Sequence, residues 1–146
     1  MAKTMSMDEF ADRLLLLTPA FMRKLMRHEQ SDVMHGLLTE PQFWGLEFLR
    51  EHGPCPVHEL ADALHLQLSS TSGLVDRLVK MGMVRRERTE ADRRVVLLSL
   101  TAKGRNTVEK DLEQKKKGFR GFCKPLSAEE RYELIEMIRK IVEEKA

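Results

Sequence analysis

The clearest alternation of apolar and polar positions lies in the middle of the chain. Apolar residues recur every three or four positions through residues 68–81, which is the period of a helix with one buried face. A shorter apolar segment at 60–66 precedes this helix, and two β-rich runs at 83–88 and 95–100 follow it. This order predicts a helix-turn-helix followed by a β-hairpin.

The helix predicted over 68–81 ends at Gly82 and has two unlike faces. One face is apolar, whereas the other begins with serines and a glycine instead of the Lys, Glu, Gln or Ala that usually cover a solvated surface. Small hydroxyl side chains let a helix N-terminus approach a large polar surface and bond to base edges or phosphates. We expect this face to bind DNA, although Arg77 has the alternative of pairing with a nearby acid. The candidate residues are Gln67, Ser69, Ser70, Ser72, Gly73, Arg77 and Lys80.

The segment that joins the two predicted strands is rich in arginine, with Arg93 and Arg94 at its tip. An arginine on a protruding hairpin can enter a narrow minor groove, where the negative potential of DNA is focused. Asp92 opposes simple attraction to phosphate, so we interpret it as a residue that orients an arginine by charge-assisted hydrogen bonds. We expect Arg94 to enter the minor groove and Arg93 to contact phosphate or solvent.

Helical periodicity also fills the N-terminal segment. A capping box at Ser6–Glu9 opens a helix whose apolar stripe continues to Met26. Thr18-Pro19 should bend or interrupt this helix, because proline removes a backbone donor and crowds the previous turn. The alternative is two shorter helices with Thr18 as a cap. The segment 30–38 is expected to be a connector.

Three further helices are predicted. A second capping box, Thr39–Gln42, opens a helix that Gly53 closes, and Cys55 lies in a short rigid turn between two prolines. Thr101 is the expected cap of a charged helix that should end or loosen near Gly118 and Gly121. A third capping box, Ser127–Glu130, opens a final helix with apolar residues at helical spacing, namely Leu134, Ile135, Ile138, Ile141 and Val142.

The terminal helices carry wider apolar stripes than a small helix-turn-helix core covers. Pairing of two chains would bury these stripes. We therefore expect residues 1–38 and 105–146 to form a dimerisation region around a DNA-binding domain at 39–104.

Composition restricts the class of protein. The chain has 146 residues, enough for one compact domain with helical extensions, and its formal charge is only +2, so the argument for DNA depends on local clusters of charge. It has no apolar run of 18 residues and no signal-peptide pattern, which favours a soluble, cytoplasmic protein without a membrane partner.

The sequence offers little catalytic or metal chemistry. No set of nucleophile, base and orienting residue, no phosphate-binding loop and no metal-ligand spacing is found, so we expect no enzyme, cofactor or metal site. Cys55 and Cys123 form no disulfide framework, which suits a reducing compartment. A redox-sensing role for a cysteine stays open as an alternative, although nothing near Cys55 in the sequence lowers the pKa of its thiol.

The chain resembles the MarR-type winged-helix transcription regulators over nearly its whole length and order of elements. The residues that carry the likeness are Asp92-Arg93-Arg94 with Leu98, Leu100-Thr101 and Gly104, Leu74–Leu78, Gly82–Val84, and Leu38–Phe43 with Leu46 and Leu49. The sequence departs from the family at Gln67, where a small hydroxyl cap is common, and at Val57, where a polar residue is usual.

The resemblance implies a mainly α-helical fold with a small β-hairpin wing, in which the terminal helices form a dimer interface. It also implies a homodimeric repressor that binds a pseudo-palindromic site on double-stranded DNA and responds to a small phenolic or aromatic effector. A winged-helix module that binds protein instead of DNA is the alternative. Candidate effector-pocket residues are Arg23, Met26, His28, His35 and Trp44.

Overall fold

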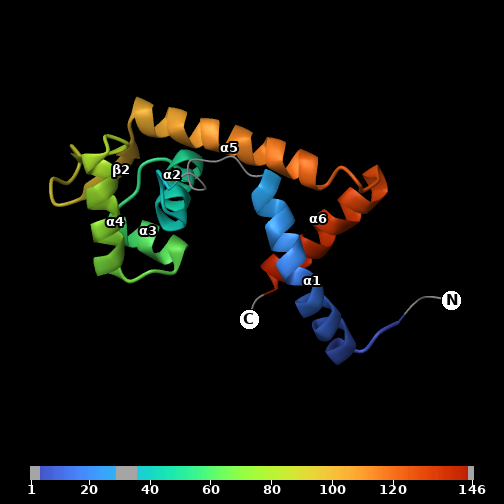
Figure 1. The fold of residues 1–146 in the computed structure, drawn as a ribbon. Coiled ribbons are helices and arrows are strands. Elements are labelled where there is room, and N and C mark those ends of the chain that lie inside the picture. The colour runs from blue at the N-terminus through green and yellow to red at the C-terminus, as the bar shows by residue number, and fades with distance from the viewer. Residues whose placement is uncertain (1–3, 29–35, 145–146) are drawn as a thin grey trace. The chain divides into compact units, whose positions relative to one another are not determined.

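The computed structural model describes residues 4–28 and 36–144, which fold into six helices and one β-hairpin (Figure 1). The chain divides into a central unit, residues 31–114, and a terminal unit made of residues 1–30 and 115–146. The predicted mainly helical fold with a β-hairpin is confirmed. The elements are α1 (Met7–His28), α2 (Glu40–His52), α3 (Val57–Leu64), α4 (Leu68–Lys80), β1 (Val84–Arg88), β2 (Val96–Leu100), α5 (Ala102–Phe122) and α6 (Ala128–Glu143).

Local capping sets the limits of α2, as the sequence predicted. The Thr39 backbone N–H donates to Gln42 Oε1 at 2.9 Å, and the Gln42 N–H donates to Thr39 Oγ1 at 3.3 Å. These two bonds satisfy donors that the first helical turn leaves without partners. The helix ends at Gly53, whose φ of 77° lies in the left-handed region that glycine adopts without strain.

The segment around Cys55 contains more structure than the expected rigid turn. The Cys55 N–H donates to the Leu98 carbonyl at 3.1 Å, and the Leu98 N–H donates to the Cys55 carbonyl at 2.7 Å. Cys55 therefore pairs with the free edge of β2 as a one-residue strand. The prediction missed this pairing because a single residue between Pro54 and Pro56 has no strand periodicity.

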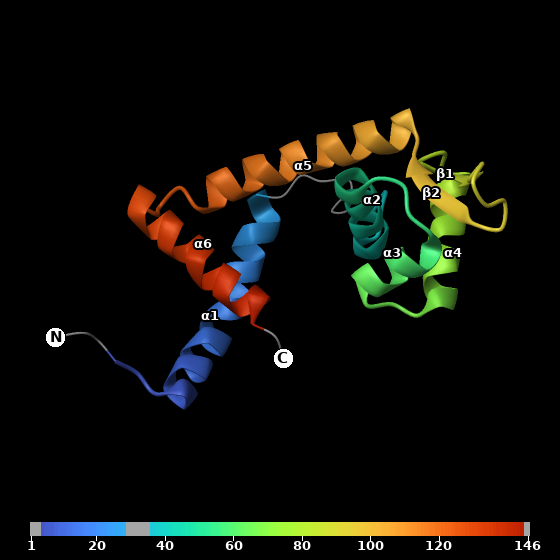
Figure 2. The same cartoon turned by 180° about the vertical axis from the view of Figure 1, so that it is seen from behind.

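Helix α4 and the hairpin follow the sequence prediction closely. Thr71, Leu74, Val75 and Leu78 are the buried residues of α4, and Gly82 has a φ of 74° just after the helix ends. The strands pair antiparallel in one register, from Val84 opposite Leu100 to Arg88 opposite Val96. Figure 2 shows the loop between them projecting from the edge of the central unit beyond α4.

An aliphatic core holds the central unit together. It combines residues from α2, α3, α4, both strands and the first half of α5, so the helix-turn-helix and the hairpin share one buried cluster. The cluster contains Leu38, Leu46, Leu49, Cys55, Leu60, Leu74, Val75, Leu78, Met83, Val84, Leu98, Leu100 and Val108.

The start of α5 is fixed against the end of α4 and the beginning of β1. Thr101 Oγ1 accepts the Gly104 N–H at 3.0 Å and donates to the Gly82 carbonyl at 2.5 Å, while the Thr101 N–H donates to the Met83 carbonyl at 3.1 Å. Gly104 is buried against Met83, the residue that precedes β1, and a Cβ at Gly104 would overlap the Met83 carbonyl oxygen. The backbone of α5 therefore approaches the backbone of Met83 at a distance that glycine alone permits.

The predicted interruption of one helix and the predicted early end of another are wrong. Helix α5 continues through Gly118 and Gly121 to Phe122, because glycine costs a helix only about 1 kcal/mol and removes no backbone donor. Helix α1 continues through Pro19, so the division into two shorter helices is also wrong. Proline removes one bond in a 22-residue helix, and the Thr18 hydroxyl donates to the Leu14 carbonyl at 2.7 Å.

The terminal unit has much less internal burial than the central one. No residue of α6 is buried, and large apolar side chains such as Leu15, Ile141 and Val142 are more than 70% exposed. The Phe21 ring of α1 meets the Phe122 ring of α5 edge to face, with centroids 4.8 Å apart. Beside this pair, α1, α5 and α6 border an apolar cavity of about 590 Å³.

Replacing Gly104 by alanine should destabilise the protein by about 3 kcal/mol, because the new methyl group would overpack the start of α5 against the Met83 backbone. Gly73→Ala is the matched control, since Gly73 lies inside α4 and a Cβ there would meet nothing within 4 Å. That change should stabilise α4 by about 0.5–1 kcal/mol. Urea unfolding at one protein concentration would measure both, and equal midpoints would contradict the packing argument.

Candidate nucleic-acid interface

The exposed face of α4 starts at a helix N-terminus without a side-chain cap. Gln67 occupies the N-cap position, but its side chain bonds to no backbone N–H of the first turn. The Gln67 carbonyl instead accepts both the N–H and the hydroxyl of Thr71, at 3.0 and 2.9 Å. First-turn N–H groups of α4 therefore stay available to an external acceptor, and the helix dipole favours an anion there.

The residues predicted to contact DNA lie along this face. Gln67, Ser69 and Ser70 are exposed around the first turn, and Ser72 and Gly73 are partly exposed one turn later. Arg77 and Lys80 are exposed in the last turn. The structure thus brings the predicted α4 residues onto one accessible surface with small side chains at its beginning and cations at its end.

An ion pair joins α4 to the hairpin. Arg86 Nη2 on β1 lies 2.5 Å from Asp76 Oδ1 on α4, so the carboxylate next to Arg77 is already engaged. The Arg77 side chain makes no ion pair or hydrogen bond within the described part of the chain, although the Arg77 carbonyl accepts the Met81 N–H at 2.9 Å. This argues against the predicted alternative that Arg77 pairs with a nearby acid. Sequence analysis did not find the Asp76–Arg86 pair, because ten residues and a change from helix to strand separate the partners.

The loop between β1 and β2 is held by its own hydrogen bonds. Thr89 Oγ1 donates to the Asp92 carbonyl at 2.7 Å and accepts the Asp92 N–H at 3.0 Å. The Thr89 N–H donates to the Val95 carbonyl at 3.2 Å, and the Val95 N–H donates to the Asp92 carbonyl at 3.0 Å. These bonds give the tip a defined backbone path.

Asp92 holds Arg94 in the way that the sequence predicted. Its Oδ1 accepts the Arg94 backbone N–H at 3.0 Å and the Arg94 Nε–H at 3.3 Å. The Arg94 side chain is nevertheless 92% exposed. The guanidinium group is therefore anchored at Nε, while its terminal nitrogens remain accessible to a ligand.

Arg93 lies beside Arg94 in a different environment. Its carbonyl accepts a hydrogen bond from Arg88 Nη1 at 3.1 Å, and its side chain lines a shallow hollow with Arg88, Thr89 and Glu90. Glu90 offsets part of the positive charge there. Arg93 consequently suits a phosphate or solvent contact better than insertion into a groove.

The two cysteines differ in environment. Cys55 is 3% exposed, and burial, with a smaller effect from the Glu59 carboxylate, raises the pKa of its thiol. A raised pKa keeps the thiol protonated and unreactive, which opposes a redox-sensing role at Cys55. Cys123 is partly exposed at the end of α5.

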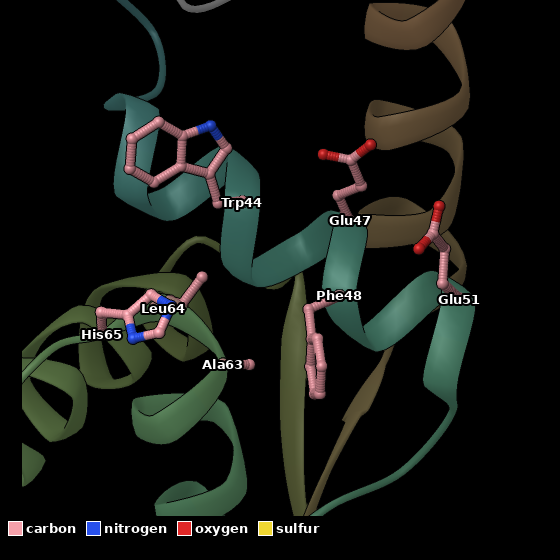
Figure 3. Close-up of a pocket in the computed structure, with 7 residues that line it drawn as sticks. All are labelled: Trp44, Glu47, Phe48, Glu51, Ala63, Leu64 and His65. Atoms are coloured by element: carbon pink, nitrogen blue, oxygen red, sulfur yellow. The ribbon is translucent and has the colours of Figure 1, made fainter. Parts of the chain in front are cut away.

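The predicted effector residues fall in different places. Trp44 of α2 lines a cavity in the central unit with Phe48 and with Leu64 of α3 (Figure 3). Arg23 and Met26 are exposed on α1 in the terminal unit. The His28 side chain and all of His35 lie outside the described residues.

The described residues contain neither a metal-binding cluster nor a membrane-spanning helix. In residues 4–28 and 36–144, no group of three or more His, Cys, Asp and Glu side chains is arranged to hold a metal ion. Over the same ranges, no helix has the length and apolar character needed to cross a membrane.

Comparison with known proteins supplies independent information. Residues 38–96 match the family described as MarR. The regulator MgrA of Staphylococcus aureus is 30% identical over 105 residues, which are 72% of this chain and 70% of MgrA. YsmB of Bacillus subtilis, an uncharacterized HTH-type transcriptional regulator, is 33% identical over 64% of each chain. The match thus spans less than two thirds of the length of YsmB.

Solved structures extend the likeness to the terminal helices. The structure of a MarR family protein from Bacillus stearothermophilus has a TM-score of 0.75 at 29% sequence identity, covering 94% of this chain and 96% of that one. The structural similarity therefore extends over nearly the whole chain.

Cys55 should react with a soluble maleimide far more slowly than Cys123 in the folded protein at pH 8, because its thiol is both buried and protonated. In 8 M urea the two thiols should react at similar rates. Mass spectrometry of peptides after timed labelling measures both sites in one sample. Equal labelling in the folded state would show that Cys55 is accessible and would reopen its redox role.

Proposed function

Because this chain belongs to the MarR family, as its sequence resemblance predicted, we propose that it is a homodimeric regulator that binds a specific sequence of double-stranded DNA. The family consists of transcription regulators and not of enzymes, in agreement with the expectation from sequence. We further propose which residues contact DNA, which helices form the dimer, and that a ligand changes the affinity for DNA.

One observation carries the proposal. The α4 N-terminus has no side-chain cap and is lined by small hydroxyl side chains, and an ion pair connects α4 to a hairpin that presents an anchored, exposed arginine. On a surface that contacts only solvent, free N–H groups beside an oriented guanidinium group would have no function. Duplex DNA offers a phosphate for the first and a narrow groove for the second.

The residues would divide the recognition between two grooves. Helix α4 would enter the major groove, with Gln67, Ser69 and Ser70 near base edges or phosphates at its N-terminus. Arg77 and Lys80 would contact the phosphate backbone. Arg94, oriented by Asp92, would enter the adjacent minor groove, and Arg93 would contact a flanking phosphate.

The dimer would be formed by the terminal helices. We assign residues 1–38 and 105–146 to dimerisation and residues 39–104 to DNA binding. The exposed apolar side chains of α1 and α6, and the apolar cavity beside Phe21 and Phe122, are the surfaces that a second chain would cover. Twofold symmetry would place two α4 helices in successive major grooves, about 34 Å apart, so the operator would be pseudo-palindromic.

Repression is the proposed direction of regulation. MdtR of Bacillus subtilis, which is 25% identical over 94% of this chain, is named a transcriptional repressor. A ligand would relieve repression if it bound more tightly to a state in which the two α4 helices no longer match the groove spacing. The regulator would act in the cytoplasm, where the operator is accessible.

Arg94→Ala should weaken binding to the operator by about 1–3 kcal/mol, because the groove contact is lost. Arg93→Ala should cost less and should mainly reduce the salt dependence of binding, as expected for one phosphate contact. Genomic fragments selected by the wild-type protein supply the operator, and fluorescence anisotropy at several salt concentrations measures affinity. Unchanged affinity of the Arg94 variant, with its dimer intact, would exclude the hairpin from recognition.

Ile138→Glu should shift the protein from dimer to monomer, because a carboxylate would be buried in the apolar contact between chains. Lys140→Glu is the control: it also adds negative charge to an exposed position of α6, but outside the apolar stripe. Sedimentation at micromolar concentration measures the association state. A monomeric wild-type protein, or an unchanged dimer in the Ile138 variant, would contradict the proposed interface.

A further inference from the structure

A cavity of about 370 Å³ lies between α2 and α3 in the central unit, apart from the exposed face of α4. Trp44, Glu47, Phe48 and Glu51 line it from α2, and Ala63, Leu64 and His65 line it from the end of α3. Figure 3 shows the two aromatic side chains on the same helix, with Leu64 and His65 on the facing segment. This volume is within the range of small-molecule sites in proteins.

Of the two aromatic rings that α2 contributes to the cavity, the indole ring of Trp44 is the one available to contact a ligand. The Phe48 ring stacks on the His52 ring, with centroids 4.2 Å apart and planes inclined by 18°, so His52 already covers one face of Phe48. Trp44 is 47% exposed, and its side chain makes no ring contact or hydrogen bond within the described residues. Tryptophan offers the most favourable π-face for a cation among the aromatic side chains.

The charges around the cavity are of one sign. Glu47 and Glu51 stand one helical turn apart on α2, and neither forms an ion pair within the described part of the chain. Two carboxylates at this spacing repel each other and slightly destabilise their helix. Neither lysine nor arginine is among the residues that line this cavity, so an acid bound here would meet two carboxylates and no basic partner of that kind.

We propose that this cavity binds an aromatic organic cation, with the ring against Trp44 and the positive charge near Glu47 and Glu51. The cavity of the terminal unit has the opposite charge, because Lys116, Arg120 and Arg131 border it. A role of the cation in releasing DNA would rest on the proposed function. The binding site itself does not depend on that function.

Trp44 is the only tryptophan of the chain, so its fluorescence reports directly on the cavity. The DNA-free protein is titrated with benzyltrimethylammonium chloride at constant ionic strength, and separately with sodium benzoate and benzyl alcohol. We expect a saturable change in Trp44 emission with the cation and binding at least about tenfold weaker with the acid. The cation should also raise the melting temperature, since it relieves the repulsion between the carboxylates.

The double variant Glu47→Gln/Glu51→Gln should bind the cation about tenfold more weakly. It removes two partly solvated negative charges that attract the cation, and it keeps the shape of both side chains. Glu109→Gln changes an exposed acid on α5 that does not line the cavity, so it is the control and should bind like the wild type. Wild-type affinity in the double variant, equal affinity for benzoate, or no saturation would overturn the proposal. Because no DNA is present, the result is independent of whether the regulator binds an operator.

Discussion

The close approach of Gly104 to the Met83 backbone is the constraint on which the proposed DNA-binding surface depends. Thr101 links this contact to the neighbouring elements, because its side chain bonds to the Gly82 carbonyl and to the Gly104 N–H. Lys103 Nζ adds a bond of 2.7 Å to the Met81 carbonyl. The C-terminus of α4, the beginning of β1 and the first turn of α5 therefore meet at one junction and cannot move independently.

Two carboxylates extend this rigidity toward the surface. Asp76 fixes α4 to β1 through Arg86, and Asp92 fixes the position of Arg94 at the hairpin tip. Each pair is solvent-accessible, so its contribution to the free energy of folding is small. Both pairs mainly restrict the orientations of α4 and of Arg94 before a ligand binds. Less conformational entropy is therefore lost when the ligand binds.

The sequence predicted features that depend on local chemistry. Capping boxes at Thr39 and Ser127, the buried face of α4 and the stop at Gly82 need only neighbouring residues, and all are present. The sequence did not predict features that depend on contacts between distant residues or on small differences in helix propensity. The pairing of Cys55 with Leu98 and the Asp76–Arg86 ion pair arise from tertiary packing. The continuity of α5 through Gly118 shows that glycine only weakens a helix.

The unequal burial of the two units bears on how a dimeric regulator would be controlled. The central unit has its own aliphatic core, whereas α6 buries no residue within the chain. Folding of the terminal helices would therefore be coupled to association, and the spacing of two α4 helices would depend on contacts that form between chains. A ligand that binds the central unit can change DNA affinity only by altering the position of α4 within its own unit or the connection of that unit to the dimer. The cavity between α2 and α3 suits the first route, because both helices pack against α4 in the same core.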